Sequence, residues 1–247
     1  MIKLFLTSSP FIEGQCEITN INIQADLLRK TVPQNANALF IPANPDDQFN
    51  TAGITHAYRA AFERQGLTFN RFAYLDHSNK EAAERLVVNS QFIVLGGGHL
   101  PTQMAFFEEI NLREHIKKIH GVVLGISAGS MNSALEVYAT PEEPGEGRNP
   151  DFQRFIPGLG LTRRQIVPHM YSYRDNYVDD LRLFEDIIFP DSKGINAYDG
   201  LPREFYILPD NSFIFDDGTT ETIYGEAWLC RDGQMRRICT HGKKLIL

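Results

Sequence analysis

Residues 122–132, with the sequence VVLGISAGSMN, constrain the fold of this chain more than any other stretch. A short apolar run leads into Gly-Ile-Ser-Ala-Gly, and small residues then open a predicted helix. This is the pattern of a nucleophile elbow, a sharp turn between a strand and a helix that exposes a serine oxygen above a sheet. The two glycines supply backbone freedom and little bulk. The stretch predicts Ser127 as a nucleophile, the alternative being a plain strand-to-helix turn.

Short apolar runs alternate with helical patterns around this elbow. Runs at residues 2–6, 38–41 and 92–95 end in turn residues, and helical spacing lies between them at 51–64. A further helix is predicted over residues 101–116. Continuous apolar strands that alternate with helices indicate a parallel sheet covered on both faces. We therefore predict an α/β fold with a mostly parallel, doubly wound, flavodoxin-like sheet and helices on both faces.

The second half of the chain has a different residue pattern. Residues 141–150 are polar and rich in Pro and Gly, which predicts a loop. The pattern then predicts strands at 161–167 and 194–198, separated by an amphipathic helix at 177–188. Turn residues interrupt the alternating pattern of residues 201–247, which we expect to form an antiparallel meander on one edge of the main sheet. One domain spans 1–247, with the main sheet in its first 200 residues.

Composition excludes several classes of function. A formal charge of −7 over 247 residues disfavours a nucleic-acid surface. The apolar runs are too short for a membrane span, and no signal-peptide pattern is present, so a cytoplasmic location is the default expectation. Three scattered cysteines, Cys16, Cys230 and Cys239, predict neither a disulfide framework nor a zinc site. A homodimer is a common arrangement for such proteins, and no sequence feature adds to that expectation.

A serine hydroxyl needs a base, which is usually a histidine oriented by a carboxylate. Of the seven histidines, His169 is the best candidate because it follows an apolar strand and so lies, like Ser127, at a carboxyl end of the sheet. The orienting acid stays open on chemistry alone. The candidates are Glu142, Glu143, Glu146, Asp151, Asp175 and Asp199.

The glycine turn after residues 92–95 is a second candidate feature of the site. Gly96-Gly97-Gly98 can present a backbone N–H to an oxyanion, with the N–H of Ala128 as the second donor. A tight turn or a phosphate cradle is the alternative. Because no Lys-Ser/Thr pair follows, a P-loop is excluded.

Three motifs in order, Leu-Gly-Gly-Gly-His, Gly-Ile-Ser-Ala-Gly-Ser and Val-Pro-His-Met, resemble the serine peptidase family of aspartyl dipeptidase E and cyanophycinase. The resemblance implies a fold like the class I glutamine amidotransferases and a triad of Ser127, His169 and an acid about fifteen residues beyond the serine, which falls on Glu142. It also places Gly98 and Ala128 in the oxyanion hole. An amidotransferase would carry cysteine at position 127.

Two departures from that family concern the substrate. His99 stands where Asn or Gln is common, and of the two arginines expected after the histidine only Arg174 is obvious. Both residues are candidate substrate-binding groups, and Asp-X specificity is left open. We therefore expect a serine peptidase, dipeptidase-like, that cleaves a peptide or related amide bond in a small substrate without a metal or organic cofactor. The alternatives are a non-catalytic ligand-binding relative and a cyanophycinase-like or esterase hydrolase.

Overall fold

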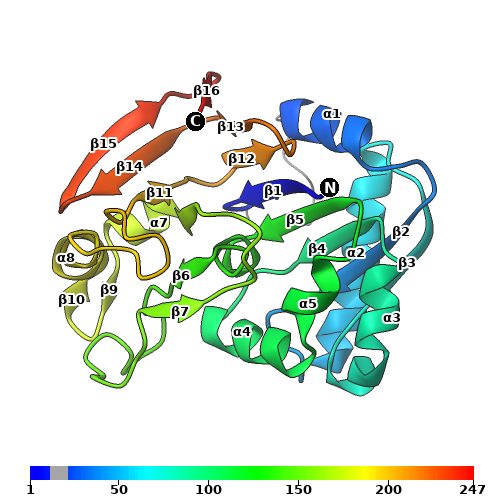
Figure 1. The fold of residues 1–247 in the computed structure, drawn as a ribbon, viewed down its shortest axis with the longest axis horizontal. Coiled ribbons are helices and arrows are strands. Elements are labelled where there is room, and N and C mark those ends of the chain that lie inside the picture. Colours follow the sequence, from blue (N-terminus) through cyan, green and yellow to red (C-terminus); the bar gives the residue numbers. More distant parts are fainter. Residues whose placement is uncertain (12–21) are drawn as a thin grey trace.

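An eight-stranded sheet in the order β16-β13-β12-β1-β5-β4-β2-β3 forms the centre of the molecule (Figure 1). The structure, a computed structural model, describes residues 1–11 and 22–247. Five neighbouring strands run parallel, namely β1 (Lys3–Thr7), β5 (Val122–Ile126), β4 (Phe92–Leu95), β2 (Ala36–Ile41) and β3 (Phe69–Tyr74). Three antiparallel strands continue the sheet beyond β1, namely β12 (Phe213–Asp216), β13 (Glu221–Tyr224) and β16 (Lys244–Ile246). The predicted α/β fold with a mainly parallel sheet is confirmed.

Helices cover both faces of this sheet because successive strand residues point in opposite directions. On one face, Leu4 and Ile93 pack in a core with α3 (Ala83–Val88), α4 (Leu100–Glu109) and α5 (Leu112–Ile116). On the other face, Phe5 and Val94 pack with α1 (Asn22–Thr31) and α2 (Gln48–Arg64). Strands buried on both sides are apolar throughout, which is why they were recognisable in the sequence.

The helix predicted over residues 101–116 is two helices in the structure. Asn111 adopts a left-handed conformation with φ of 51° and ends α4 before α5 begins. Asn takes up this conformation more readily than most residues. The break still lets Leu112 and Ile116 pack into the same core as α4. A short 3₁₀ segment, η1 (His77–Ala82), similarly precedes α3.

A second sheet lies beside the first, in the order β15-β14-β11-β8. It consists of β8 (Gln165–Val167), β11 (Phe205–Ile207), β14 (Ala227–Arg231) and β15 (Gln234–Cys239). Figure 1 shows β14 and β15 at the opposite end of the molecule from β3. Strands β12 to β16 are antiparallel, as expected, but they are divided between the two sheets. Strand β11 instead runs parallel to β8.

Residues 177–188 do not form the predicted helix. They form a small hairpin of β9 (Tyr177–Val178) and β10 (Leu181–Arg182), then a π-helical segment, η2 (Leu183–Ile188), and α8 (Phe189–Asp191) follows directly. Asp179 and Asp180 at the hairpin turn have φ of 51° and 64°. The Asp179 carboxylate accepts hydrogen bonds from the backbone N–H groups of Gly145 and Gly147. With these contacts to a distant loop, residues 177–182 form a hairpin and not a helix. The apolar residues of η2 pack with the second sheet.

Two predicted strands also differ from the observed structure. The strand expected at 161–167 is confined to β8, and residues 194–198 form a turn with a single bridge from Ile195 to Pro202. In that turn the Asn196 side chain accepts a hydrogen bond from the Tyr198 N–H, which is characteristic of Asx turns. A separate hairpin pairs β6 (Glu136–Tyr138) with β7 (Phe155–Pro157).

Two of the three cysteines lie within the described residues. Cys230 and Cys239 are free and buried, and burial raises the pKa of both thiols. Cys16 lies outside the described residues. No helix in residues 1–11 and 22–247 is long and apolar enough to cross a membrane.

Candidate active site

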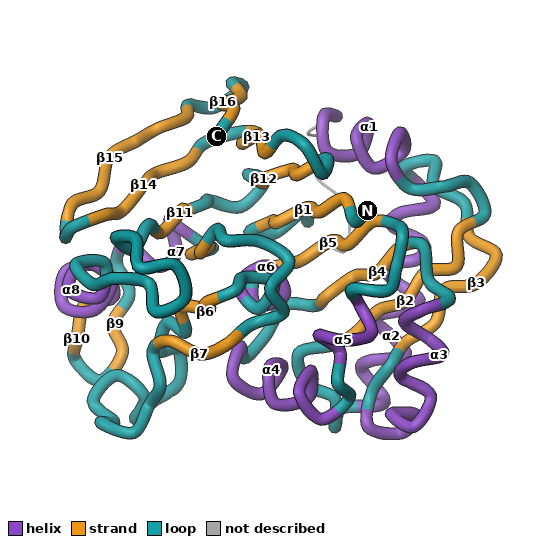
Figure 2. Tube along the Cα trace, in the orientation of Figure 1, coloured by secondary structure: helices purple, strands orange, loops and turns teal. Residues whose placement is uncertain are grey.

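Ser127 lies at a sharp turn between β5 and a one-turn helix, α6 (Ala128–Met131). Figure 2 shows α6 near the centre of the molecule. Ser127 has φ of 48° and ψ of −112°, a conformation that costs a non-glycine residue about 1–3 kcal/mol. Its backbone N–H donates to the carbonyl oxygens of Thr7 and Ser8 at 3.0 and 2.9 Å. These hydrogen bonds to the end of β1 hold the strained turn in place. A sharp turn between a strand and a helix is the geometry expected of the elbow predicted from the sequence.

The glycines of the elbow are required for close packing. A Cβ atom on Gly125 would lie 2.7 Å from the Ser130 Cα, and one on Gly129 would lie 2.3 Å from the Leu95 carbonyl oxygen. Neither glycine has positive φ, so backbone freedom, which the sequence suggested, is not their role. Any larger residue would push α6 away from β4 and β5 and displace Ser127.

His169 follows β8 and precedes α7 (Met170–Arg174). It has left-handed φ and ψ of 55° and 40°, and its backbone N–H donates to the Ser8 Oγ at 2.8 Å. The His169 Nε2 lies 2.9 Å from the Ser127 Oγ. The structure thus brings together the predicted nucleophile and the predicted base, which are 42 residues apart.

The other ring nitrogen of His169 contacts Asp210, a residue that the sequence did not single out. The distance from His169 Nδ1 to Asp210 Oδ1 is 2.8 Å. Because a carboxylate only accepts, Nδ1 carries the proton, and Nε2 is left free to accept from the Ser127 hydroxyl. Ser8 Oγ donates to the same Asp210 oxygen at 2.6 Å.

The charge of Asp210 is favoured by these contacts. Burial alone would raise the pKa of its carboxyl, but the hydrogen bonds from His169 and Ser8 outweigh it and hold the pKa below the usual value. The turn that carries Asp210 is fixed by two backbone hydrogen bonds, from Ser8 N–H to Ser212 O and from Asn211 N–H to Ser9 O. Asp210 is therefore ionised at neutral pH and firmly placed behind His169.

Glu142 makes no hydrogen bond to the imidazole ring of His169. Its Oε1 accepts a hydrogen bond from the Tyr173 hydroxyl at 2.5 Å, whereas the Nδ1 position it was expected to occupy is taken by Asp210. Burial raises the pKa of Glu142, while the Tyr173 hydrogen bond and the charge of His169 act in the opposite direction. Glu142 lies beside α7 because other residues of its loop contact distant parts of the chain. The spacing of Glu142 from Ser127 in the sequence does not reveal such contacts.

The other candidate acids also have different partners or positions. Glu146 binds His99, and Asp199 lies 3.9 Å from the Arg163 guanidinium. Glu143, Asp151 and Asp175 are exposed. In the part of the chain that the structure describes, none of these residues forms a hydrogen bond with the His169 ring.

The glycine turn lies against the serine, as the sequence predicted. A Cβ atom on Gly97 would be 3.3 Å from the Ser127 Cβ. Gly98, with φ of 138°, lines the same cavity as Ser127, and a Cβ there would meet the Ala43 Cβ at 2.8 Å. Ala128 follows Ser127 directly as the first residue of α6. Both expected oxyanion donors thus belong to segments adjacent to the nucleophile.

The two residues expected to bind substrate lie away from this cavity. The His99 ring contacts Thr102 Oγ1 at 2.7 Å and Glu146 Oε1 at 2.9 Å. The second oxygen of Glu146 accepts the backbone N–H groups of Glu142 and Glu143. His99 therefore helps to fix the loop of residues 141–150. Arg174 is exposed and lines a different cavity, of about 300 Å³.

The Ser127 cavity has a volume of about 310 Å³. This is at the lower end of the range of about 300–1,000 Å³ that is usual for small-molecule sites. Its lining residues are Gly98, Ser127, Pro141, Glu142, His169, Tyr173, Asn176 and Leu183.

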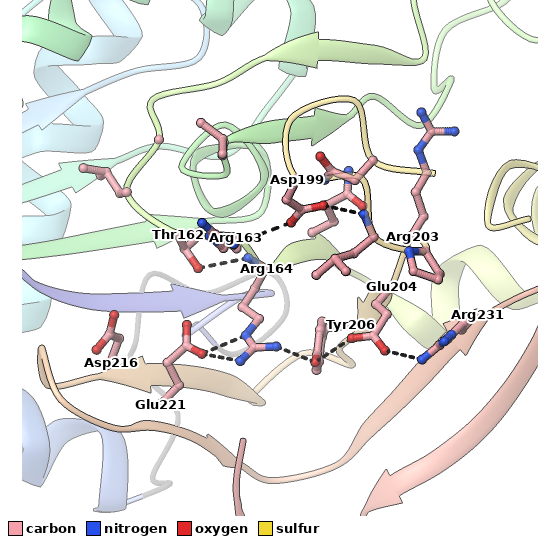
Figure 3. A pocket seen from close by; sticks show the side chains of 17 residues that line it. Thr162, Arg163, Arg164, Asp199, Arg203, Glu204, Tyr206, Asp216, Glu221 and Arg231 are labelled. Atoms are coloured by element: carbon pink, nitrogen blue, oxygen red, sulfur yellow. Dashed lines mark hydrogen bonds and ion pairs between the residues drawn. The ribbon is translucent and has the colours of Figure 1, made fainter. Parts of the chain in front are cut away.

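A larger cavity, of about 600 Å³, is lined by other residues (Figure 3). Arg164 donates to Glu221 at 2.8 Å and to the Tyr206 hydroxyl at 2.8 Å, while Arg231 pairs with Glu204 at 3.2 Å. These four charges thus form pairs within the cavity, and the cavity contains neither Ser127 nor His169. The described residues also include no group of three or more His, Cys, Asp or Glu that could hold a metal ion. Ser127 and His169 both line the smaller cavity.

A parallel α/β sheet with a serine elbow and a histidine at hydrogen-bond distance places the protein among the serine hydrolases. Residues 4–198 match Peptidase_S51, described as Peptidase family S51. The chain belongs to this family, which includes peptidase E and cyanophycinase, and it is a serine-type peptidase.

Solved structures show the same fold. The crystal structure of a peptidase from an acI-B1 Actinobacterium has a TM-score of 0.68 at 15% identity, covering 99% of this chain and 96% of that one. The structure of a putative peptidase E protein from Listeria monocytogenes EGD-e has a TM-score of 0.57 at 17% identity, covering 97% and 100%. No curated protein matches the chain.

Proposed function

We propose that this peptidase hydrolyses a peptide bond in a small substrate through a triad of Ser127, His169 and Asp210. The observation that carries the proposal is the continuous chain of contacts from Ser127 Oγ to His169 Nε2 at 2.9 Å and from His169 Nδ1 to Asp210 at 2.8 Å. Asp210 takes the orienting role that the resemblance assigned to Glu142.

Each member of the triad has a defined step. Ser127 Oγ attacks the substrate carbonyl while His169 Nε2 accepts its proton, and His169 then donates that proton to the leaving amine. The negative charge of Asp210 stabilises the imidazolium that forms between these steps. Water subsequently hydrolyses the acyl-enzyme with His169 as the base again. The N–H groups of Gly98 and Ala128 are the proposed donors to the oxyanion.

A small substrate is favoured by the size of the site. A cavity of about 310 Å³ holds only a few groups next to the scissile bond. The loop of residues 141–150 forms one wall, through Pro141 and Glu142. A short peptide, with a dipeptide as the simplest case, matches this volume better than an extended chain does.

Fluorophosphonate labelling tests the triad directly, because only an activated serine reacts rapidly. We expect the wild-type protein to label and Ser127→Ala to remain unlabelled and folded. Ser172→Ala is the matched control, since Ser172 is exposed on α7. Absence of labelling in folded wild-type protein would overturn the proposal and favour a relative that binds ligands without turnover.

A further inference from the structure

Among the described residues, Glu142 is the only Asp, Glu, Lys or Arg that lines the Ser127 cavity. Apart from His169, the other lining groups are neutral: Gly98, Ser127, Pro141, Tyr173, Asn176 and Leu183. The basic residue expected to bind an acidic side chain, Arg174, lines a separate cavity. The charge that a substrate meets beside the nucleophile is therefore negative.

The Glu142 carboxylate is held in a fixed position. The Tyr173 hydroxyl donates to its Oε1, and its own backbone N–H donates to the Glu146 carboxylate at 2.8 Å. Tyr173 is buried, and burial together with the nearby charge of Glu142 raises the pKa of its phenol well above the usual value. The hydroxyl is therefore protonated at neutral pH and donates to Glu142. A ligand would meet a carboxylate that is already oriented.

No cation among the described residues forms an ion pair with this carboxylate, and the charges of His169 and His99 act on it only at longer range. His99, which could have done so, is paired with Glu146 at 2.9 Å. Among the ion pairs formed by the described residues, none includes Glu142. Its contact with Tyr173 satisfies one oxygen without cancelling the charge. An unpaired carboxylate facing a cavity attracts a cationic group and repels an acidic one.

We propose that Glu142 binds an ammonium group of the substrate, so that the peptidase prefers a positively charged substrate to one with Asp beside the scissile bond. This inference rests on the proposed function, since it assigns the substrate of the same site. The ammonium has two sources, the free N-terminus of a short peptide or the side chain of a lysine. Tyr173 is a positioning residue that acts through Glu142.

Four coumarin amides separate these sources: alanine, acetyl-alanine, acetyl-lysine and aspartate 7-amido-4-methylcoumarin. Recognition of the N-terminus predicts turnover of the first and little of the second, whereas recognition of a side chain predicts turnover of the third. In either case the aspartate substrate should be poorer than the alanine one. Faster cleavage of the aspartate amide than of the alanine amide would overturn the proposal.

Glu142→Gln tests the carboxylate while conserving its shape. We expect it to lower kcat/KM for the preferred ammonium substrate about 10- to 100-fold, mainly through KM, because a hydrogen bond to a charged group is lost. Turnover of acetyl-alanine amide and the rate of fluorophosphonate labelling should fall much less, because neither reaction uses an ammonium group. Glu143→Gln is the matched control, since that neighbouring side chain is exposed, as Glu142 is, but does not line the cavity.

Two results would contradict this role for Glu142. If Glu142→Gln slows labelling and all substrates alike, the carboxylate acts through His169 and not on the substrate. If it changes neither charge preference nor KM, the carboxylate does not bind substrate.

A binding experiment separates this inference from the triad. Alaninamide should bind to Ser127→Ala, as measured by calorimetry, and bind about 10- to 100-fold more weakly once Glu142→Gln is added. N-acetylalaninamide should show no such difference. This result stands even if wild-type protein fails to label, so failure of the proposed function and failure of the inference can be told apart. Equal binding to both proteins would overturn the inference.

Discussion

Replacing Asp210 with Asn distinguishes between the two acids considered for the triad. The substitution keeps the shape of the side chain, and an amide oxygen can still accept the hydrogen bonds from His169 Nδ1 and Ser8 Oγ. What is lost is the negative charge beside the imidazolium that forms when Ser127 attacks. The effect should therefore appear in kcat and in the labelling rate, with little change in KM.

The magnitude follows from the geometry. Opposite unit charges about 4 Å apart, at an effective dielectric constant of about 20, attract by about 4 kcal/mol. The Asp210 side chain is 44% exposed, so water screens the pair, and roughly half of that energy remains as a lower bound. A loss of about 2–4 kcal/mol slows the chemical step by about 30- to 1,000-fold.

The assay is steady-state hydrolysis of a preferred amide substrate, with fluorophosphonate labelling as a measure that does not depend on substrate recognition. Asp232→Asn is the control, because Asp232 is an exposed acid in a turn with φ of 53°, a conformation that Asn tolerates. A melting curve checks that the Asp210 variant is folded. A folded Asp210→Asn protein with a kcat within about threefold of the wild-type value would refute the assignment, because the expected loss is far larger.

Two further substitutions test the surroundings of the site. Tyr173→Phe removes the hydrogen bond that lowers the pKa of Glu142 and leaves the burial that raises it. Ammonium binding needs the ionised carboxylate, so as the pH falls it should be lost at a higher pH in the variant than in wild type. The acidic limb of the kcat/KM profile should therefore shift to higher pH for free-amine substrates and stay in place for acetylated ones. Gly129→Ala should cost at least about 1–3 kcal/mol of unfolding free energy, because its Cβ would lie 2.3 Å from a backbone oxygen. Gly53→Ala, with open space around it inside α2, should be neutral or stabilising in the same denaturant titration, and equal stabilities would contradict the packing argument.

The parts of the site that lie at the ends of apolar strands were predictable from the sequence. Ser127 follows β5, the glycine turn follows β4 and His169 follows β8 by two residues. Buried parallel strands have a strong local signal, and parallel strands bring their carboxyl ends to one edge of a sheet. The general position of Ser127 and of the glycine turn therefore followed from the order of the strands. His169 was expected at the end of a strand of the same sheet, but β8 belongs to the second sheet.

Asp210 was not predictable in this way, although it follows a strand too. Ile207, at the end of β11, pairs with Val167 at the end of β8, so the two parallel strands direct Asp210 and His169 to the same edge. The sequence around β11 alternated like an antiparallel meander, and that interpretation concealed the parallel pairing with β8. The missing information was a long-range strand pairing.

Glu142 illustrates a second limit, because its position depends on the shape of a loop. The loop is fixed by Asp179, which is 34 residues from Gly145, and by the pair of Glu146 with His99, which are 47 residues apart. Side-chain contacts across such distances have no periodic signal. Spacing from the serine therefore suggested that Glu142 would be near the site, but it did not distinguish a contact with the histidine from a position in the substrate cavity.

Ser8 shows why the site needs both sheets. It follows β1 in the central sheet, and its hydroxyl accepts the His169 N–H and donates to Asp210, whose segments continue from strands of the second sheet. Its carbonyl also accepts the Ser127 N–H at the elbow. One residue thus fixes the nucleophile, the base and the acid relative to one another. In the sequence, Ser8 is part of an ordinary Thr-Ser-Ser-Pro turn, because its importance arises only when the two sheets pack together.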